Sequence, residues 1–287
     1  MEKIEFGLRV KKNIFKKSSE DYPLVSIITA VKNGEKYIKK TIESVISQTY
    51  KNIEYIIIDG FSTDKTLDII KKYEDVIDYC VSEKDNGISE AFNKGIKLSN
   101  GELIGIINSD DWYEPNTVEK VVKVYKSDKN IEIIHGDLRF FKDNVPLFVI
   151  SPHNNPQKIW TDMIYNHPTC FVKKDIYIKY GMYNEKYKYA MDYELLLRFY
   201  INGVKFYYIN DILANMRYEG KSDKNAIKAL KETREISINY GYPAYKANFW
   251  FIYKSTKYIL KKIIGKDSKV IQFLRKFSKR KKIISNK

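Results

Sequence analysis

Two adjacent aspartates follow an apolar stretch in the first half of the chain. In LIGIINSDDWYEP (residues 103–115), five residues without polar side chains lead toward Asp110 and Asp111. Two like charges at the end of a buried strand repel each other and lose hydration, so the ionised pair needs compensating partners. A divalent cation or a hydrogen-bonding ligand would compensate it. For an isolated pair ahead of Pro115, capping of a following helix is the simpler interpretation.

A third carboxylate, Asp59, ends another apolar run, IEYIIID (residues 53–59). In open α/β sheets, ligands bind outside the carboxyl ends of the strands, so we expect Asp59, Asp110 and Asp111 to face one crevice. Carboxylate oxygens suit Mg²⁺ or Mn²⁺, which commonly hold phosphates. The sequence contains neither GxGxxG nor GxxxxGK[ST], which argues against the dinucleotide and P-loop modes of phosphate binding.

Alternating β-branched runs and amphipathic segments must position these acids. Strands are predicted at 24–31, 53–59, 77–82, 103–107 and 131–137, and helices at 35–48, from Ser62 or Thr63, at 88–98 and from Pro115. Apolar strands alternating with helices indicate an α/β fold with a buried, mostly parallel sheet covered on both faces. Farther along, we predict a hairpin at 138–150, a helix at 191–203, two short strands at 205–210 and 212–218, and helices from Ser222.

The composition favours a soluble protein of a reducing compartment. The chain of 287 residues is 44% hydrophobic, enough for one large domain with appendages. Cys80 and Cys170 lack metal-ligand spacing and suit the cytosol. Residues 1–23 lack the apolar core of a signal peptide, and no window reaches the ~18 uncharged apolar residues of a spanning helix. We therefore expect a cytoplasmic protein that contacts membranes only from their surface.

The net charge of +15 is concentrated at the end of the chain. Residues 266–287 carry nine basic side chains against one acid, Asp267. The preceding segment, 248–264, places aromatic and aliphatic residues at near-helical spacing among lysines. Either this helix lies in a membrane interface and the tail adds about 1 kcal/mol per nearby basic residue, or it packs on the main domain before a solvated tail. We predict peripheral contact of the tail with the anionic inner face of the cytoplasmic membrane.

Two long segments resemble a known enzyme family. Residues 23–70, PLVSIITAVKNGEKYIKKTIESVISQTYKNIEYIIIDGFSTDKTLDII, and 82–115, SEKDNGISEAFNKGIKLSNGELIGIINSDDWYEP, are similar to the nucleotide-binding half of inverting family-2 glycosyltransferases. The resemblance implies the Rossmann-like GT-A fold. It divides the chain into an N-terminal extension (1–22), a catalytic domain (23–222, with nucleotide-binding half 23–137 and acceptor half 138–222), and C-terminal helices with a basic tail (223–287).

The resemblance also implies donor-binding roles. Asp59 matches the aspartate that reads a pyrimidine, usually uracil. Gly60 and then Phe61 follow it where many members have a second acid or a small residue, and this departure leaves the base preference open. Asp110 corresponds to a residue near the ribose, and Asp111 corresponds to the ligand of Mg²⁺ or Mn²⁺. The other donor-side matches are Thr29, Ala30, Val31, Asp85, Gly87, Asn93 and Arg217. For Arg217, a surface salt bridge is the alternative.

On the acceptor side, Asp192 in YKYAMDYELLLRF matches the family's general base. Such a base takes the proton of the attacking hydroxyl group. Asp192 and Glu194 should point to different sides of their helix, so only one is expected to reach the crevice. The tentative acceptor-side residues are His167, Glu194 and Trp112. The alternatives are helix capping for Asp192, a structural hydrogen bond for His167, and core packing for Trp112.

The expected function is transfer of a sugar from a nucleotide-diphosphate donor, a UDP-sugar, with inversion. The acceptor would be a lipid-linked or membrane-held glycan of a bacterial surface polysaccharide, such as O-antigen or capsule, and the alternative is a soluble or protein acceptor. A sugar-phosphate nucleotidyltransferase would need a glycine- and arginine-rich loop, which TAVKNGEKY lacks. A basic protein that binds nucleotides or nucleic acid without catalysis leaves the ordered acids unexplained, so no nucleic acid partner is expected.

Overall fold

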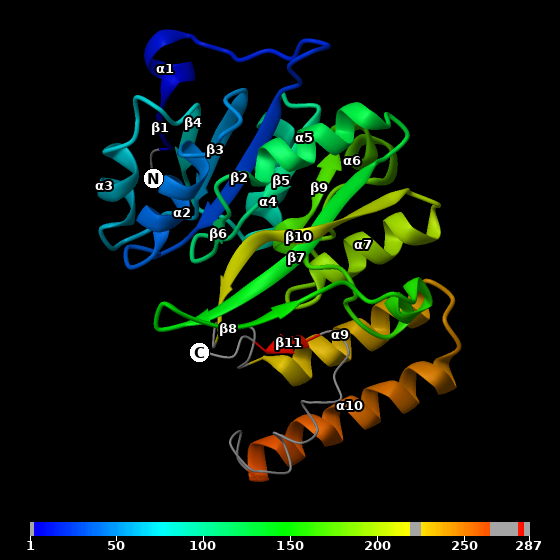
Figure 1. Cartoon of the computed structure of the whole chain (residues 1–287). Coiled ribbons are helices and arrows are strands. Elements are labelled where there is room, and N and C mark those ends of the chain that lie inside the picture. Colours follow the sequence, from blue (N-terminus) through cyan, green and yellow to red (C-terminus); the bar gives the residue numbers. More distant parts are fainter. Residues whose placement is uncertain (1–2, 219–224, 265–280, 284–287) are drawn as a thin grey trace.

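The computed structural model describes residues 3–218, 225–264 and 281–283 of the chain (Figure 1). These residues form one mixed sheet of order β1-β4-β3-β2-β5-β9-β7-β10-β6, with β8 paired to β7 and β11 paired to β8. The strands are β1 (Ile4–Phe6), β2 (Val25–Val31), β3 (Ile53–Asp59), β4 (Tyr79–Ser82), β5 (Leu103–Ile106), β6 (Trp112–Tyr113), β7 (Ile133–Lys142), β8 (Val145–Ile150), β9 (Phe171–Lys173), β10 (Phe206–Arg217) and β11 (Lys281–Ile283).

Helices cover both faces of this sheet. They are α1 (Leu8–Lys12), α2 (Ile38–Ile46), α3 (Thr66–Lys71), α4 (Ile88–Leu98), α5 (Thr117–Ser127), α6 (Lys174–Tyr180), α7 (Met191–Ile201), α9 (Ala226–Asn239) and α10 (Ala244–Ile264), with 3-10 turns η1 (Pro156–Trp160) and η2 (His167–Thr169). Successive strand residues point to opposite faces, so Ile27 packs with α2, α3 and α5, and Ile28 packs with α4, α6 and α7. The α/β class and the mostly parallel central sheet are confirmed.

The centre of the sheet consists of β4, β3, β2 and β5, which run parallel to one another. All seven residues of both β2 and β3 are buried, as expected for strands covered on both faces. Val31 and Asp59 are paired at the carboxyl ends of these two strands. The loops that follow β2, β3, β4 and β5 therefore emerge at one edge of the sheet.

The structure corrects three predicted boundaries. The two strands predicted at 205–210 and 212–218 are the single strand β10, parallel to β7, in which bulges between Ile209 and Ala214 absorb the polar break. Helix α5 begins at Thr117 instead of Pro115, with Asn116 at its N-cap position. Helix α3 begins at Thr66, because Ser62 hydrogen-bonds the Asp59 carboxylate and does not cap the helix.

The ends of the chain join the main fold in different ways. Strand β1, in the predicted N-terminal extension, pairs antiparallel with β4, and Arg9 forms a salt bridge with the buried Glu54. At the other end, α10 lies along the lower edge of the molecule, outside α9 (Figure 1). Most of the basic tail lies outside the described residues, but the backbone of β11 pairs with β8. Among the described helices, none combines the length and the apolar character needed to cross a bilayer.

Candidate functional site

The loops after β2 and β3 are joined by hydrogen bonds. The backbone N–H of Asn33 donates to Ser62 Oγ at 2.8 Å, and the Thr63 N–H donates to Asn33 Oδ1 at 2.8 Å. The Gly34 N–H donates to Thr66 Oγ1 at 2.8 Å. These bonds hold the carboxyl ends of the two strands as one unit, which gives the edge of the sheet a fixed shape.

Asp59 is fully buried in this unit and already has hydrogen-bond donors. Its carboxylate accepts from the Ser62 N–H at 3.0 Å, from Ser62 Oγ at 2.5 Å and from Ser82 Oγ at 2.5 Å. Donors to an ionised carboxylate offset the loss of its hydration. Asp59 is therefore held in one orientation by the protein itself.

Gly60 lies close to Asp85, which is in the loop between β4 and α4. A Cβ atom at residue 60 would collide with the Asp85 carboxylate. Burial raises the pKa of Asp85, and the nearby charge of Lys32 opposes this shift. Asp85 also accepts a bond from the Gly87 N–H at 3.1 Å. Asp85 thus brings a carboxylate to the end of β3 from the loop after β4.

Phe61 is a candidate that the sequence reasoning missed. It has a φ angle of 60°, in the left-handed region that bulky side chains rarely adopt. Strain of this kind persists where surrounding contacts enforce it, and it is common at functional sites. Phe61 is partly exposed and lies in the loop directly after β3, between Gly60 and Ser62.

The first-strand segment Thr29–Val31 contributes mainly backbone to this edge. The Thr29 hydroxyl lies 3.2 Å from the Tyr55 hydroxyl and is fully buried. Ala30 and Val31 are also buried, and the Val31 carbonyl accepts from the Gly60 N–H at 2.8 Å. Thr29 therefore belongs to the core, and the expected ligand contact of this segment is left to its last residues.

Asp111 differs from Asp59 in how its carboxylate is satisfied. Its side chain is 1% exposed, yet its two described contacts are long: 3.2 Å from Asn108 Nδ2 and 3.4 Å from the Arg217 N–H. Burial raises the pKa of the Asp111 carboxyl group well above its usual value, and the charge of Asp110 adds to this shift. A cation placed here would relieve both effects.

A polar stripe on and just after helix α2, which the sequence reasoning also missed, holds the Asp110–Asp111 turn. The stripe consists of Thr41 and Ser44 on α2 and of Gln48, which follows the end of the helix. The Thr41 hydroxyl lies 2.9 Å from the Ser109 carbonyl and 2.7 Å from the Asp111 carbonyl. The Tyr113 N–H donates to Ser44 Oγ at 3.2 Å, and Gln48 Nε2 donates to the Glu114 carbonyl at 2.7 Å. The apolar face of α2 is buried in the core, and this polar stripe fixes the acidic turn.

Two cations stand beside Asp111 on aromatic rings. The Arg217 guanidinium carbon lies 3.9 Å from the Tyr37 ring centroid, and Lys40 Nζ lies 3.3 Å from the Trp112 ring centroid. Burial, together with the charge of Arg217, lowers the pKa of Lys40. Within the described residues, neither cation forms a salt bridge. Two like charges held together in this way can bind an anion such as a diphosphate.

The Trp112 ring packs mainly against Lys40 and Arg217 and exposes little surface to a ligand. Its side chain is 9% exposed, and its ring centroid lies 4.9 Å from that of Phe141. Trp112 pairs with Asn215 of β10, which aligns the end of that strand with the acidic turn. The expected acceptor contact of Trp112 is therefore limited to a small part of its ring.

Asp192 and His167 lie close together in the second half of the fold. Asp192 lies in the first turn of α7, and its Oδ1 accepts from the Tyr193 N–H at 2.8 Å. Nε2 of His167 lies 2.5 Å from the Tyr183 hydroxyl. Burial lowers the pKa of His167, and the charge of Asp192 opposes this shift. The turn η2, which contains His167, packs against β5, the strand that leads to the two aspartates.

The structure gives Glu194 a role different from the expected acceptor contact. Glu194 is 1% exposed and forms a salt bridge with Arg198, with nitrogen–oxygen distances of 2.9 and 3.0 Å. It also accepts from the Tyr240 hydroxyl at 2.5 Å. Because these partners join α7 to α9, we assign Glu194 to the packing of the fold.

Asn93 likewise has protein partners in place of the expected donor contact. Its Nδ2 donates to the Tyr183 carbonyl and to Glu185 Oε1, both at 2.9 Å, and its Oδ1 accepts from the Tyr183 N–H at 2.8 Å. The amide group therefore fastens α4 to the loop that carries Tyr183. Because Tyr183 also contacts His167, these bonds of Asn93 help to fix the position of His167.

The acidic turn fits a divalent cation that arrives with a phosphate ligand. Among the described residues, no three histidine, cysteine or acidic side chains converge to form a metal cage. Mg²⁺ commonly takes only one or two carboxylates and completes its shell with water and substrate phosphates. The Asp111 carboxylate is buried and only weakly hydrogen-bonded, and Asp110 is next to it in the chain. These two residues offer such hard oxygen donors.

Several known proteins are similar to this chain in sequence or in structure. The chain is 31% identical over 225 residues to hyaluronan synthase of Pasteurella multocida, a match that covers 76% of this chain and 23% of the synthase. The Staphylococcus aureus protein TarS in complex with UDP-GlcNAc has a TM-score of 0.60 at 18% identity, over 79% of this chain and 70% of that one.

A second solved structure covers more of the fold. The mannosyltransferase PcManGT of Pyrobaculum calidifontis, in complex with GDP-Man and Mn²⁺, gives a TM-score of 0.62 at 16% identity, over 93% of this chain and 83% of that one. These likenesses show the GT-A fold. The family profile described as glycosyl transferase family 2 matches residues 26–181, more than half of the chain, which therefore belongs to that enzyme family.

Proposed function

We propose that this glycosyltransferase moves a sugar from a UDP-sugar donor, with inversion, to a lipid-linked or membrane-held glycan during synthesis of a bacterial surface polysaccharide. The observation that carries the proposal is the state of Asp111: a buried carboxylate with two long contacts, beside the cations Lys40 and Arg217. This arrangement suits a ligand that brings both a divalent cation and negative phosphates.

On the donor side, each residue has a distinct task. Lys40 and Arg217 bind the diphosphate oxygens by charge-assisted hydrogen bonds. A Mg²⁺ or Mn²⁺ held by Asp111 and Asp110 would neutralise the charge that develops on the departing nucleotide diphosphate. Asp59, fixed by Ser62 and Ser82, accepts a hydrogen bond from the base. The UDP-GlcNAc complex of TarS supports a nucleotide-sugar donor whose base is uracil.

On the acceptor side, Asp192 is the general base. Its carboxylate takes the proton of the acceptor hydroxyl group while that oxygen bonds to the anomeric carbon and the bond to the diphosphate breaks. Within the described residues, Asp192 Oδ2 has no hydrogen-bond partner, so it remains available for this proton. His167, beside Asp192, orients the acceptor. The similarity to a synthase of a polysaccharide, hyaluronan, supports a glycan acceptor.

The experiment is a donor screen with purified full-length protein. UDP-glucose, UDP-N-acetylglucosamine, UDP-galactose, UDP-glucuronate and GDP-mannose are each incubated with Mn²⁺ or with EDTA. Release of the nucleoside diphosphate is measured, and product NMR reports the anomeric configuration. We expect Mn²⁺-dependent release from a UDP-sugar, faster when a lipid-linked glycan is added, and a product of inverted configuration.

The controls separate the donor from the acceptor. Asp111→Asn should be inactive, whereas Asp68→Asn, an exposed acid on α3, should behave as wild type. Turnover of GDP-mannose alone would contradict the uracil assignment. Stimulation only by soluble sugars or proteins would contradict the membrane-held acceptor and favour the alternative of a soluble or protein acceptor.

A further inference from the structure

Helix α10 presents an apolar face to solvent. Its exposed apolar side chains, 49–75% accessible, are Tyr245, Phe249, Ile252, Tyr253, Ile259, Leu260 and Ile263. At 3.6 residues per turn they share an arc of roughly 120°. An amphipathic helix on a soluble domain normally turns such an arc toward the core. The exposure of these side chains places the arc on the side of α10 that faces away from the protein. The helix itself forms the lower edge of the molecule (Figure 1).

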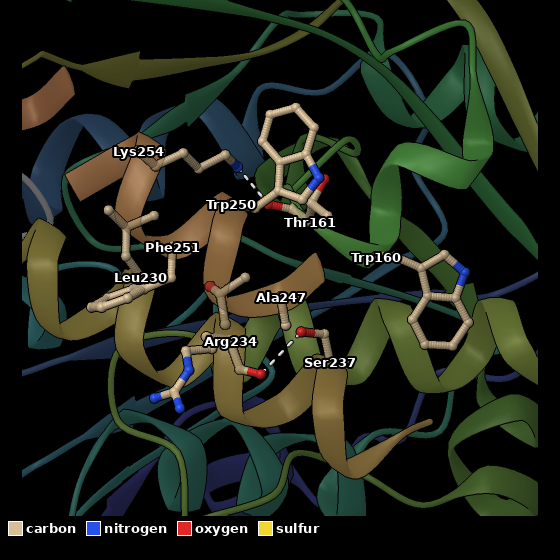
Figure 2. A pocket seen from close by; sticks show the side chains of 10 residues that line it. Trp160, Thr161, Leu230, Arg234, Ser237, Ala247, Trp250, Phe251 and Lys254 are labelled. Carbon is tan, nitrogen blue, oxygen red and sulfur yellow. Dashed lines mark hydrogen bonds between the residues drawn. The ribbon is translucent and has the colours of Figure 1, made fainter. Parts of the chain in front are cut away.

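The opposite face of α10 is already packed against the protein. Ala247 is buried, and Arg234 of α9 donates to Asn248 Oδ1 at 2.5 Å. Figure 2 shows Lys254 reaching the Thr161 carbonyl, a bond of 2.5 Å, and Lys254 also pairs with Asp162 at 3.1 Å. These contacts fix the rotation of α10 about its axis, so the outward direction of the apolar arc is set by the fold.

The hollow between α9 and α10 does not explain the arc. It is an open hollow whose space of about 250 Å³ includes bulk solvent, and it is lined by Trp160 of η1 and by Trp250 and Phe251 on the inner side of α10. The space inside it holds no more than about one water molecule, too little for a small-molecule site. The hollow and the apolar arc are on opposite sides of α10, so the surface that needs a partner is the outer one.

The charge of this region selects that partner. Helix α10 contains five lysines and no acid, and the exposed Lys246 and Lys257 border the apolar arc. The chain continues into residues 266–287, with nine basic side chains and one acid. A second copy would bring this positive charge against itself, which is unfavourable. A surface that is negative and accepts apolar side chains fits, and an anionic lipid bilayer has both properties.

We propose that the outer face of α10 is a membrane-binding surface. The helix lies in the plane of the interface, with its apolar arc among the lipid headgroups and its bordering lysines on lipid phosphates. Tyr245 and Tyr253 are amphipathic aromatic residues of the kind that settle at this depth. The surface would hold the enzyme where a membrane-held acceptor is found. The proposal concerns binding alone and does not depend on the donor chemistry.

The test is co-sedimentation of the full-length protein with vesicles of phosphatidylcholine, with and without phosphatidylglycerol, in the absence of substrates. Wild type should bind the phosphatidylglycerol vesicles, and less tightly in high salt. The double variant Phe249→Glu with Ile252→Glu should bind at least about tenfold more weakly, because two apolar contacts become negative charges. Its hydrolysis of free donor should be unchanged.

A matched control and a milder variant complete the test. Ile178→Glu changes an apolar side chain on α6 that is 72% exposed, and it should leave vesicle binding unchanged. If the glutamates disturb folding, the milder double variant Phe249→Ser with Ile252→Ser replaces them. It should also lose vesicle binding, but by a smaller factor. The proposal is overturned if wild type does not bind phosphatidylglycerol vesicles. It is also overturned if both double variants of α10 bind as wild type does, since the basic tail alone would then account for binding. A wild-type dimer that the double variant dissociates would also overturn it.

Discussion

Two buried aspartates at neighbouring strand ends differ in how they are satisfied. Asp59 accepts three hydrogen bonds of 2.5–3.0 Å from Ser62 and Ser82. Asp111 is as buried, but its two contacts are 3.2 and 3.4 Å, and burial beside Asp110 raises its pKa. The first carboxylate is well hydrogen-bonded by the folded chain, whereas the second is poorly compensated, and a cation bound there would stabilise its ionised form. We infer that Asp59 recognises the nucleotide base and that Asp111 binds a cation.

Removing the proposed general base should lower turnover strongly and should leave both strand-end carboxylates intact. Asp192→Asn is expected to lower turnover by roughly 10²–10⁴-fold, because the acceptor proton loses its recipient. UDP affinity, measured by calorimetry with Mn²⁺, should stay within about twofold of wild type, which is within ~0.4 kcal/mol. A collapse of UDP affinity would show that Asp192 belongs to the donor side or to folding.

Removing a cation beside Asp111 should weaken donor binding next. Lys40→Met keeps the length of the side chain and its contact with Trp112 but removes the charge. Loss of one charge-assisted bond of about 1.5–3 kcal/mol should weaken UDP binding by roughly 10–100-fold. Lys123→Met, an exposed lysine on α5, is the control. If Lys40→Met binds UDP as tightly as wild type does, Lys40 has no role in donor binding and only packs on Trp112.

The sharpest stability test sets the two aspartates against each other. Asp59→Asn should destabilise the free protein by about 1–3 kcal/mol, because donors from Ser62 and Ser82 then meet a neutral amide. Asp111→Asn should stabilise it on the order of 1 kcal/mol, about 2–4 °C in Tm, because a poorly compensated charge is removed.

The pH dependence of the Asp111→Asn gain has a definite sign. Since the folded-state pKa of Asp111 lies above its ordinary value of 3.8, folding favours the protonated acid, and the penalty of the ionised form grows with pH. The gain should be largest near neutral pH and vanish as pH falls toward 3.8. Thermal unfolding of both variants without metal or nucleotide measures this. Destabilisation by both substitutions would remove the distinction between the two carboxylates.

The sequence predicts the parts of this arrangement that follow local patterns. Apolar β-branched runs indicate the buried parallel strands, and an acid after such a run must lie at the carboxyl edge of the sheet. That suffices to bring Asp59, Asp110 and Asp111 to one edge. Nothing in these patterns distinguishes a satisfied carboxylate from an unsatisfied one, since the donors Ser82 and Arg217 come from distant strands.

The remaining site residues depend on long-range contacts. The apolar spacing of α2 shows which face is buried, but the roles of Lys40 and Thr41 appear only when the acidic turn lies beside them. Glu194 belongs to the packing of the fold because Tyr240, 46 positions away, approaches it from the end of α9. The sequence predicted two strands on either side of Asp211, but bulges carry β10 through this position.

The most direct measurement compares UDP binding by wild type, Asp111→Asn and Asp59→Asn, each by calorimetry with Mn²⁺ and with EDTA. Wild type should bind UDP more tightly with Mn²⁺. Asp59→Asn should bind UDP more weakly but keep the Mn²⁺ dependence, because it loses a base contact and no charge site. Asp111→Asn should lose the Mn²⁺ dependence altogether. Wild-type binding of UDP and Mn²⁺ by Asp111→Asn would contradict the assignment of Asp111 as the residue that binds the cation.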